Sequence, residues 1–155
     1  MVIREAGLLF RGYSLVHAHY HRTSDDKIHP DIRSGLLTAF LNFAETAFSK
    51  GLVEYFEMNK FIIAFIGDNI KTIDGIEPEL LISYAILDKE KKVDKYISKV
   101  IIPSLKKMSI QFKEKYNGKN LSLISQFKSF KQNLDTIFGS DTKTLNQKLK
   151  GTFFD

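Results

Sequence analysis

Two long apolar runs in the middle of the chain most limit how it can fold. The segments Phe61–Ile66 (FIIAFI) and Leu80–Leu87 (LLISYAIL) are apolar at almost every position. Side chains of a strand point alternately to opposite faces, so a strand with one face in water would alternate apolar and polar residues. We therefore expect both runs to be central strands of a sheet that is covered on both faces.

Three further strands are predicted from shorter runs rich in apolar and aromatic residues. They cover Val2–Phe10, Tyr13–Arg22 and Leu52–Met58. Arg11 and Gly12 separate the first two strands, and glycine adopts the positive φ of a tight hairpin turn. The segment Gly67–Glu79 mixes Gly, Asp, Asn and Pro and is longer than a hairpin turn, so it is predicted to be a loop.

Apolar residues recur at helical spacing in three other segments. The predicted helices cover Asp31–Gly51, Lys91–Tyr116 and Leu123–Gly139. Pro103 lies inside the second pattern, and proline lacks an amide N–H and clashes with the preceding turn. The second helix is therefore expected to be kinked or split at this residue.

The order of these elements is strand, strand, helix, strand, strand, strand, helix, helix. It predicts an α+β fold in which the first helix covers one face of a five-stranded antiparallel sheet and the last two cover the other. With 155 residues the chain has the size of one ordinary domain. We expect residues 1–139 to form this domain and residues 140–155 to form a C-terminal tail or a short docked helix.

Composition and missing motifs exclude several classes of protein. The absence of cysteine rules out a disulfide scaffold and thiol catalysis, and it suits a reducing cytoplasm. No apolar run approaches the ~18 residues of a membrane-spanning helix. Glycine-rich nucleotide loops and a Gly-x-Ser-x-Gly elbow are also missing. We therefore expect a cytoplasmic protein that is not an enzyme and that has no cofactor.

The element order resembles the longin domain over essentially the whole chain. The strings Gly7-Leu8-Leu9-Phe10 and Ser34-Gly35-Leu36-Leu37-Thr38-Ala39-Phe40 are similar in texture to longin and roadblock proteins of archaeal type, and profilin-like domains share much of the layout. The resemblance implies an adaptor that associates with small GTPases or with a membrane-trafficking complex. It also implies pairing, either as a homodimer or with another longin or roadblock chain.

In the sheet order that the resemblance implies, 2-1-5-4-3, the strands Tyr13–Arg22 and Leu52–Met58 are the edges. Exposed edge strands can accept a strand from a partner. The outer surface of the first helix and the second of these edges are therefore the expected partner-binding surface. Its candidate residues are Asn42, Glu45, Leu52, Glu54, Phe56 and Met58. For Phe56 and Met58 the alternative is that they are core residues facing a helix.

Three histidines alternate along the second predicted strand and suggest a different function. His17, His19 and His21 occupy positions i, i+2 and i+4, which point to one face of a strand. Zinc sites use alternating histidines of this kind, so a small metal-binding or ligand-sensing domain is the alternative function. The other interpretation is an edge strand whose polar face is histidine, with Val16, Ala18 and Tyr20 facing inward.

Lysine accumulates in the C-terminal half of the chain. Residues 1–85 carry 8 Lys/Arg and 11 Asp/Glu, whereas residues 86–155 carry 15 and 7. The candidates for contact with an anionic surface are Lys91, Lys92, Lys95, Lys99, Lys106 and Lys107. A solvated helix face and peripheral contact with a membrane are both consistent with this pattern. Nucleic acid is disfavoured because no arginine follows Arg33 and no aromatic residues are interleaved on the polar face.

Overall fold

The computed structural model describes residues 3–20, 36, 39–40, 43, 53–57 and 60–139. The strands are β1 (Ile3–Phe10), β2 (Tyr13–His19), β3 (Val53–Glu57), β4 (Phe61–Ile70) and β5 (Glu79–Asp88). The helical segments are α2 (Val93–Tyr96), the π-helical turn η1 (Ile97–Ile101), α3 (Ile102–Tyr116), the 3₁₀-helix η2 (Ile124–Phe130) and α4 (Lys131–Phe138). We call residues 89–139 the helical layer. The predicted α+β class is confirmed.

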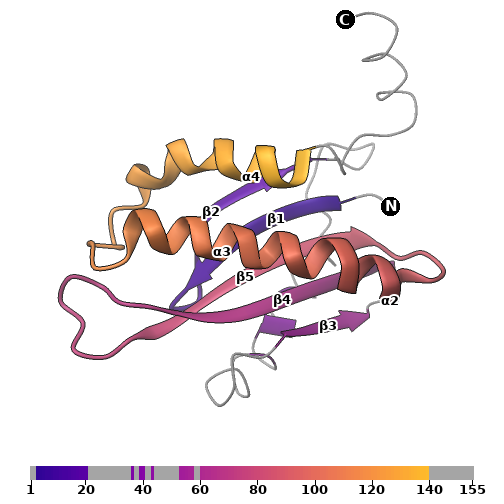
Figure 1. Cartoon of the computed structure of the whole chain (residues 1–155), viewed down its shortest axis with the longest axis horizontal. Helices are drawn as coiled ribbons and strands as arrows, with labels where there is room; N and C mark the ends of the chain where they lie inside the picture. The colour runs from indigo at the N-terminus through magenta and orange to yellow at the C-terminus, as the bar shows by residue number, and fades with distance from the viewer. Residues whose placement is uncertain are drawn as a thin grey trace, which may run out of the picture.

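The five strands form one antiparallel sheet in the order β2-β1-β5-β4-β3. Figure 1 shows α2, η1 and α3 as one long rod across the sheet, with α4 beside it over β1 and β2. The edges are β2 and β3, which are the two strands that were expected there. The apolar strands β4 and β5 lie inside the sheet, because their side chains need cover on both faces.

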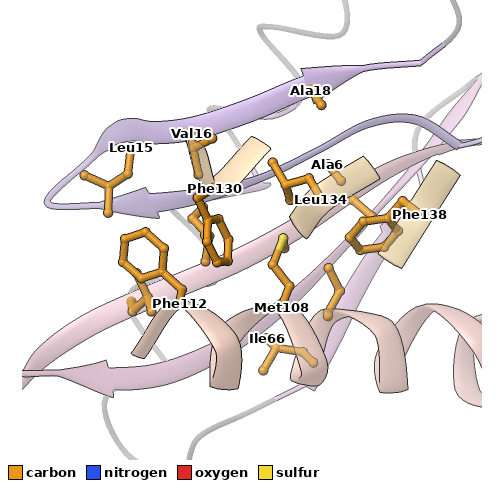
Figure 2. Close-up of a cluster of buried hydrophobic side chains, with 14 of the residues drawn as sticks. Ala6, Leu15, Val16, Ala18, Ile66, Met108, Phe112, Phe130, Leu134 and Phe138 are labelled. Carbon is orange, nitrogen blue, oxygen red and sulfur yellow. The ribbon is translucent and has the colours of Figure 1, made fainter. Parts of the chain in front are cut away.

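Alternate residues of β4 enter two different cores. Ala64 and Ile66 pack towards the helical layer with Met108 and Phe112 of α3, in the helix-side core that Figure 2 shows. The neighbouring residue Phe65 packs on the opposite face of the sheet, in what we call the opposite core. The prediction that the central strands are covered on both faces is therefore confirmed.

Residues of the first predicted helix cover the opposite core. Leu36, Ala39 and Phe43 are helical and buried, and the ring of Phe43 stacks on Phe65 with centroids 5.1 Å apart. Phe40 is also helical and packs against the rim of this core. The other residues of this predicted helix lie outside the described residues, as does the predicted tail over residues 140–155.

A π turn interrupts the second predicted helix just before Pro103, but the chain continues as one helical rod and does not split in two. The chain is α-helical over Val93–Tyr96, widens to a π turn over Ile97–Ile101, and becomes α-helical again in α3. Proline at the second position of α3 has no amide N–H to donate the regular α-helical hydrogen bond. A π turn before it changes the hydrogen-bond pattern where that donor is missing. No helix among the described residues is long and apolar enough to cross a membrane.

Two predicted boundaries were wrong. The loop predicted to begin at Gly67 begins later, because β4 continues to Ile70 and pairs residue by residue with β5 up to Glu79. A polar residue can continue the strand because strand pairing uses backbone groups. The side chain of Asp68 accepts hydrogen bonds from Ser109 and Lys113 of α3. The third predicted helix is 3₁₀ over Ile124–Phe130 before it becomes α-helical.

The 3₁₀ start of this helix has a packing reason. Phe127 and Phe130 are three residues apart and both are fully buried against Phe112, with ring centroids 5.3 and 5.2 Å from it. Side chains at i and i+3 eclipse in a 3₁₀-helix, so both rings enter the same part of the core. Burial of two aromatic rings decides the local conformation here.

Candidate functional sites

The β3 edge is the first candidate site. Val53–Glu57 pairs antiparallel with β4 on one side, and no strand among the described residues pairs with its other side. The second edge strand, β2, also has one unpaired side, and η2 and α4 pack on its helix-side face. An edge strand presents backbone N–H and C=O groups that a partner strand can bind.

Among the residues predicted for this edge, the structure places the side chain of Phe56. It is half-buried and lies edge-on to Phe65, with ring centroids 5.8 Å apart. Its packing against the opposite core supports the alternative that Phe56 is a core residue. Glu54 lies in β3, but its side chain is not described. Asn42, Glu45, Leu52 and Met58 lie outside the described residues.

Tyr55 is the β3 residue that the sequence analysis missed. Its side chain is exposed, and its hydroxyl donates a hydrogen bond to Asp94 of α2. This bond to a carboxylate raises the pKa of Tyr55 above its ordinary value. The hydrogen bond therefore ties the side chain of Tyr55 at the open edge to α2 of the helical layer.

The histidine strand is the second candidate site. His17 and His19 share one face, with ring centroids 5.0 Å apart, while Val16 and Ala18 are buried in the helix-side core. Nδ1 of His17 lies 2.9 Å from Oγ of Ser14. The expected orientation of this strand is therefore present, but His21 lies outside the described residues.

A buried carboxylate engages one of these histidines. Glu5 is only 3% exposed, and its Oε1 lies 2.9 Å from Nδ1 of His19. The hydroxyl of Tyr84 donates a hydrogen bond to the other carboxylate oxygen. A buried carboxylate needs such donors, because its charge is costly to remove from water. We call Glu5, His19 and Tyr84 the buried triad.

Gly7 makes room for the buried triad. It pairs with His17 on β2 and with Tyr84 on β5. A Cβ at this position would lie 2.6 Å from the carbonyl oxygen of Val16 and 2.9 Å from Cε1 of Tyr84. The missing side chain therefore allows the tyrosine ring to lie across β1 and reach Glu5.

The described residues do not bring metal ligands together. No group of three or more His, Cys, Asp or Glu side chains in the described part of the chain is placed to hold a metal ion. The nitrogen of His19 that faces Glu5 is already engaged with that carboxylate. What this arrangement does is orient the imidazole ring of His19 through its contact with Glu5.

A pocket of about 360 Å³ lies on the same face of the sheet as the opposite core. Leu9, Phe40 and Ile82 are among its apolar lining residues. At its rim, Arg11 donates two hydrogen bonds to Glu79, of 2.8 and 2.6 Å, and this partner lowers the pKa of Glu79. The pocket does not include His17 or His19, so it is separate from the histidine strand.

The predicted lysines all lie on the helical layer and are exposed. Lys91 and Lys92 precede α2, Lys95 is in α2, Lys99 is in η1, and Lys106 and Lys107 are in α3. The sequence analysis missed the exposed aliphatic residues that accompany them, which are Ile110, Leu123 and Ile124. Ile110 lies off the apolar stripe of α3, so helical spacing could have revealed it. Leu123 lies four residues before the buried Phe127, so this spacing predicted it to be buried, and that expectation was wrong.

Comparisons of the chain with models of protein families, with curated proteins and with solved structures found no match.

Proposed function

We propose that this chain is a non-enzymatic protein-interaction module that uses the β3 edge to bind a partner. The observation that supports the proposal is that β3 pairs with a described strand on one side only. Both faces of the sheet are buried, so a strand from another protein can add only at an edge. Of the two edges we choose β3, because its exposed Tyr55 offers an aromatic side chain that a partner strand can contact.

The partner in this proposal is a protein with an exposed strand or a matching helix surface. A second copy of this chain, another longin or roadblock chain, and a small GTPase are the three partners that the resemblance in element order suggests. Backbone pairing supplies the affinity in such complexes, and side chains beside the edge supply specificity. Tyr55 is the exposed aromatic residue placed to do this.

A charge placed at the edge tests this proposal. We expect Tyr55→Lys to abolish pairing, because a lysine on an edge strand must be desolvated when a partner strand adds. Asp94 lies within reach of the new ammonium group, so the fold should be retained. Light scattering over a range of concentrations measures self-association, and titration with small GTPases loaded with a GTP analogue measures the other partner class.

Ile76→Lys is the matched control. Ile76 is 94% exposed in the loop between β4 and β5, away from the edge, so this variant should pair like the unmodified chain. Equal loss of pairing in both variants would contradict the role of the β3 edge. A chain that stays monomeric at high concentration and binds none of the three partner classes would contradict the whole proposal.

The metal-binding or ligand-sensing function remains the alternative. The observation in its favour is that His17 and His19 lie on the same face of β2. A metal site would need a third ligand such as His21. Stoichiometric zinc, nickel or copper in protein purified without a tag would favour it over the interaction module.

A further inference from the structure

The helical layer carries a large excess of positive charge. Residues 89–139 include twelve lysines and four acidic residues. Lys89 and Lys113 contact acids of the sheet, with Nζ 3.6 Å from Glu57 and 3.0 Å from Asp68. The other ten are exposed and form no ion pair with a described residue: Lys91, Lys92, Lys95, Lys99, Lys106, Lys107, Lys115, Lys119, Lys128 and Lys131.

The acids of the layer do little to neutralise these lysines. Of the four, Asp94 accepts the hydrogen bond from Tyr55 at the β3 edge. The remaining three, Glu90, Glu114 and Asp135, are spread from one end of the layer to the other. The helical layer therefore carries an excess of exposed positive charge that the described ion pairs do not balance.

Exposed aliphatic side chains lie among the lysines. Ile110 in α3 is 54% exposed and lies one turn after Lys106 and Lys107. Leu123 and Ile124, at the start of η2, are 61% and 49% exposed. A surface that combines basic side chains with exposed aliphatic residues matches the interface of a bilayer, where headgroups are charged and the acyl region is apolar.

The same surface suits nucleic acid poorly. The aromatic residues of α3, η2 and α4 are buried, among them Phe112, Tyr116 and Phe127, so the described part of the layer offers no exposed ring on which a base could stack. The layer also contains no arginine, whose planar group favours bidentate recognition of phosphates. Lysine acts as a point charge, and a point charge is enough for electrostatic attraction to anionic lipid headgroups.

We propose that the outer side of the helical layer docks on an anionic lipid bilayer. The lysine ammonium groups contact the headgroups, and Ile110, Leu123 and Ile124 enter the boundary with the acyl chains. This inference goes beyond the proposed function, because the β3 edge is a different surface. Figure 1 shows the long rod of α2, η1 and α3 lying flat across the sheet, while β3 is at its margin.

Sedimentation with vesicles tests the bilayer proposal. The chain should bind phosphatidylcholine vesicles that contain phosphatidylserine, bind pure phosphatidylcholine far less, and dissociate as salt is raised. Lys106→Glu should weaken binding roughly tenfold, because it removes one attraction and adds one repulsion. Ile110→Ser should also weaken binding, but it should leave the salt dependence unchanged, since it removes an apolar contact.

Lys60→Glu is the matched control, because it changes the net charge equally at an exposed turn between β3 and β4. It should bind nearly as well as the unmodified chain. Equal weakening by Lys60→Glu and Lys106→Glu would overturn the proposal, as would no binding at low salt. Binding to an oligonucleotide but not to vesicles would overturn it too. Tyr55→Lys should still bind vesicles, so failure of β3 pairing is distinguishable from failure of this surface.

Discussion

At the scale of single residues, one glycine determines whether the buried triad can form. Glu5 is buried and needs two donors, and one of them, the hydroxyl of Tyr84, reaches it across β1. Strand neighbours normally carry side chains that would block this path. Gly7 removes the obstacle at the point where Tyr84 crosses. Glycine is needed at this position because Tyr84 and the backbone of Val16 come close to it, and not because of an unusual backbone angle.

Gly7→Ala should therefore destabilise the chain by about 1–3 kcal/mol. The new methyl group would meet a backbone carbonyl at 2.6 Å, and backbone atoms cannot move away as a flexible side chain can. Urea unfolding followed by circular dichroism measures the change.

Gly139→Ala controls for the general effect of replacing glycine. Gly139 has helical angles, and a Cβ there would meet none of the described residues within 4 Å. This variant should stay within about 1 kcal/mol of the unmodified chain. If Gly7→Ala behaved in the same way, the steric role of Gly7 would be wrong.

At the scale of elements, aromatic rings join η2 to α3. Phe112 of α3 contacts Phe127 and Phe130 of η2, and Tyr116 lies edge-on to Phe127 at 4.8 Å. The same segment packs against β2. Removal of one of these rings should therefore loosen both η2 and the β2 edge.

Phe130→Ala should lower the free energy of unfolding by about 3–5 kcal/mol, because the ring is fully buried and leaves a cavity. Ile124→Ala in the same 3₁₀-helix should cost only about 1 kcal/mol or less, since Ile124 is half exposed. Hydrogen exchange should become faster at the β2 amides in the first variant only. Unchanged exchange there would show that η2 does not protect β2.

At the scale of the whole molecule, polar contacts join the helical layer to the sheet. Asp68 of β4 accepts hydrogen bonds from Ser109 and Lys113 of α3, both at 3.0 Å, and from the amide of Asn69 at 2.7 Å. Partial burial raises the pKa of Asp68, but these three donors outweigh it and the pKa is lowered overall. Folding therefore favours the charged carboxylate.

This contact makes stability depend on pH. An aspartate whose pKa is lower in the folded state stabilises fully above its unfolded pKa of about 3.9, and this contribution is lost as the pH falls through the lower, folded pKa. Asp68→Asn should cost roughly 1–2 kcal/mol near neutral pH, allowing for solvent screening of a partly exposed pair. The difference from the unmodified chain should shrink below a pH of about 4.

Urea unfolding at several pH values measures this dependence. Glu79→Gln is the comparison, because its pKa is also lowered but its partner Arg11 is exposed, so its removal should matter much less. A penalty for Asp68→Asn that does not change with pH would mean that packing, rather than charge, is what the variant loses.

The surfaces proposed for binding lie on different parts of the molecule. The exposed lysines belong to the helical layer, and the open edge is at β3, on the margin of the sheet. One face of the sheet carries the helical layer, and the helical residues Leu36, Ala39 and Phe43 cover the other.

The sequence by itself determined the strands, the burial of the central ones and the irregularity of the helix near Pro103. These features follow from local rules: alternation of side chains along a strand, helical spacing of apolar residues, and the missing N–H of proline. The orientation of His17 and His19 away from the helix-side core also followed from alternation. Each of these predictions depends on residues that are close together in the chain.

Only the tertiary structure decided which distant residues meet. Glu5 and Tyr84 are 79 positions apart in the sequence, and Asp68 and Lys113 are 45 apart. No local sequence pattern therefore predicts either contact. The 3₁₀ start of η2 and the extension of β4 to Ile70 were decided in the same way, by packing and by pairing with another segment. Local periodicity reports which side of an element is apolar, whereas the partner of each side chain depends on how the elements assemble.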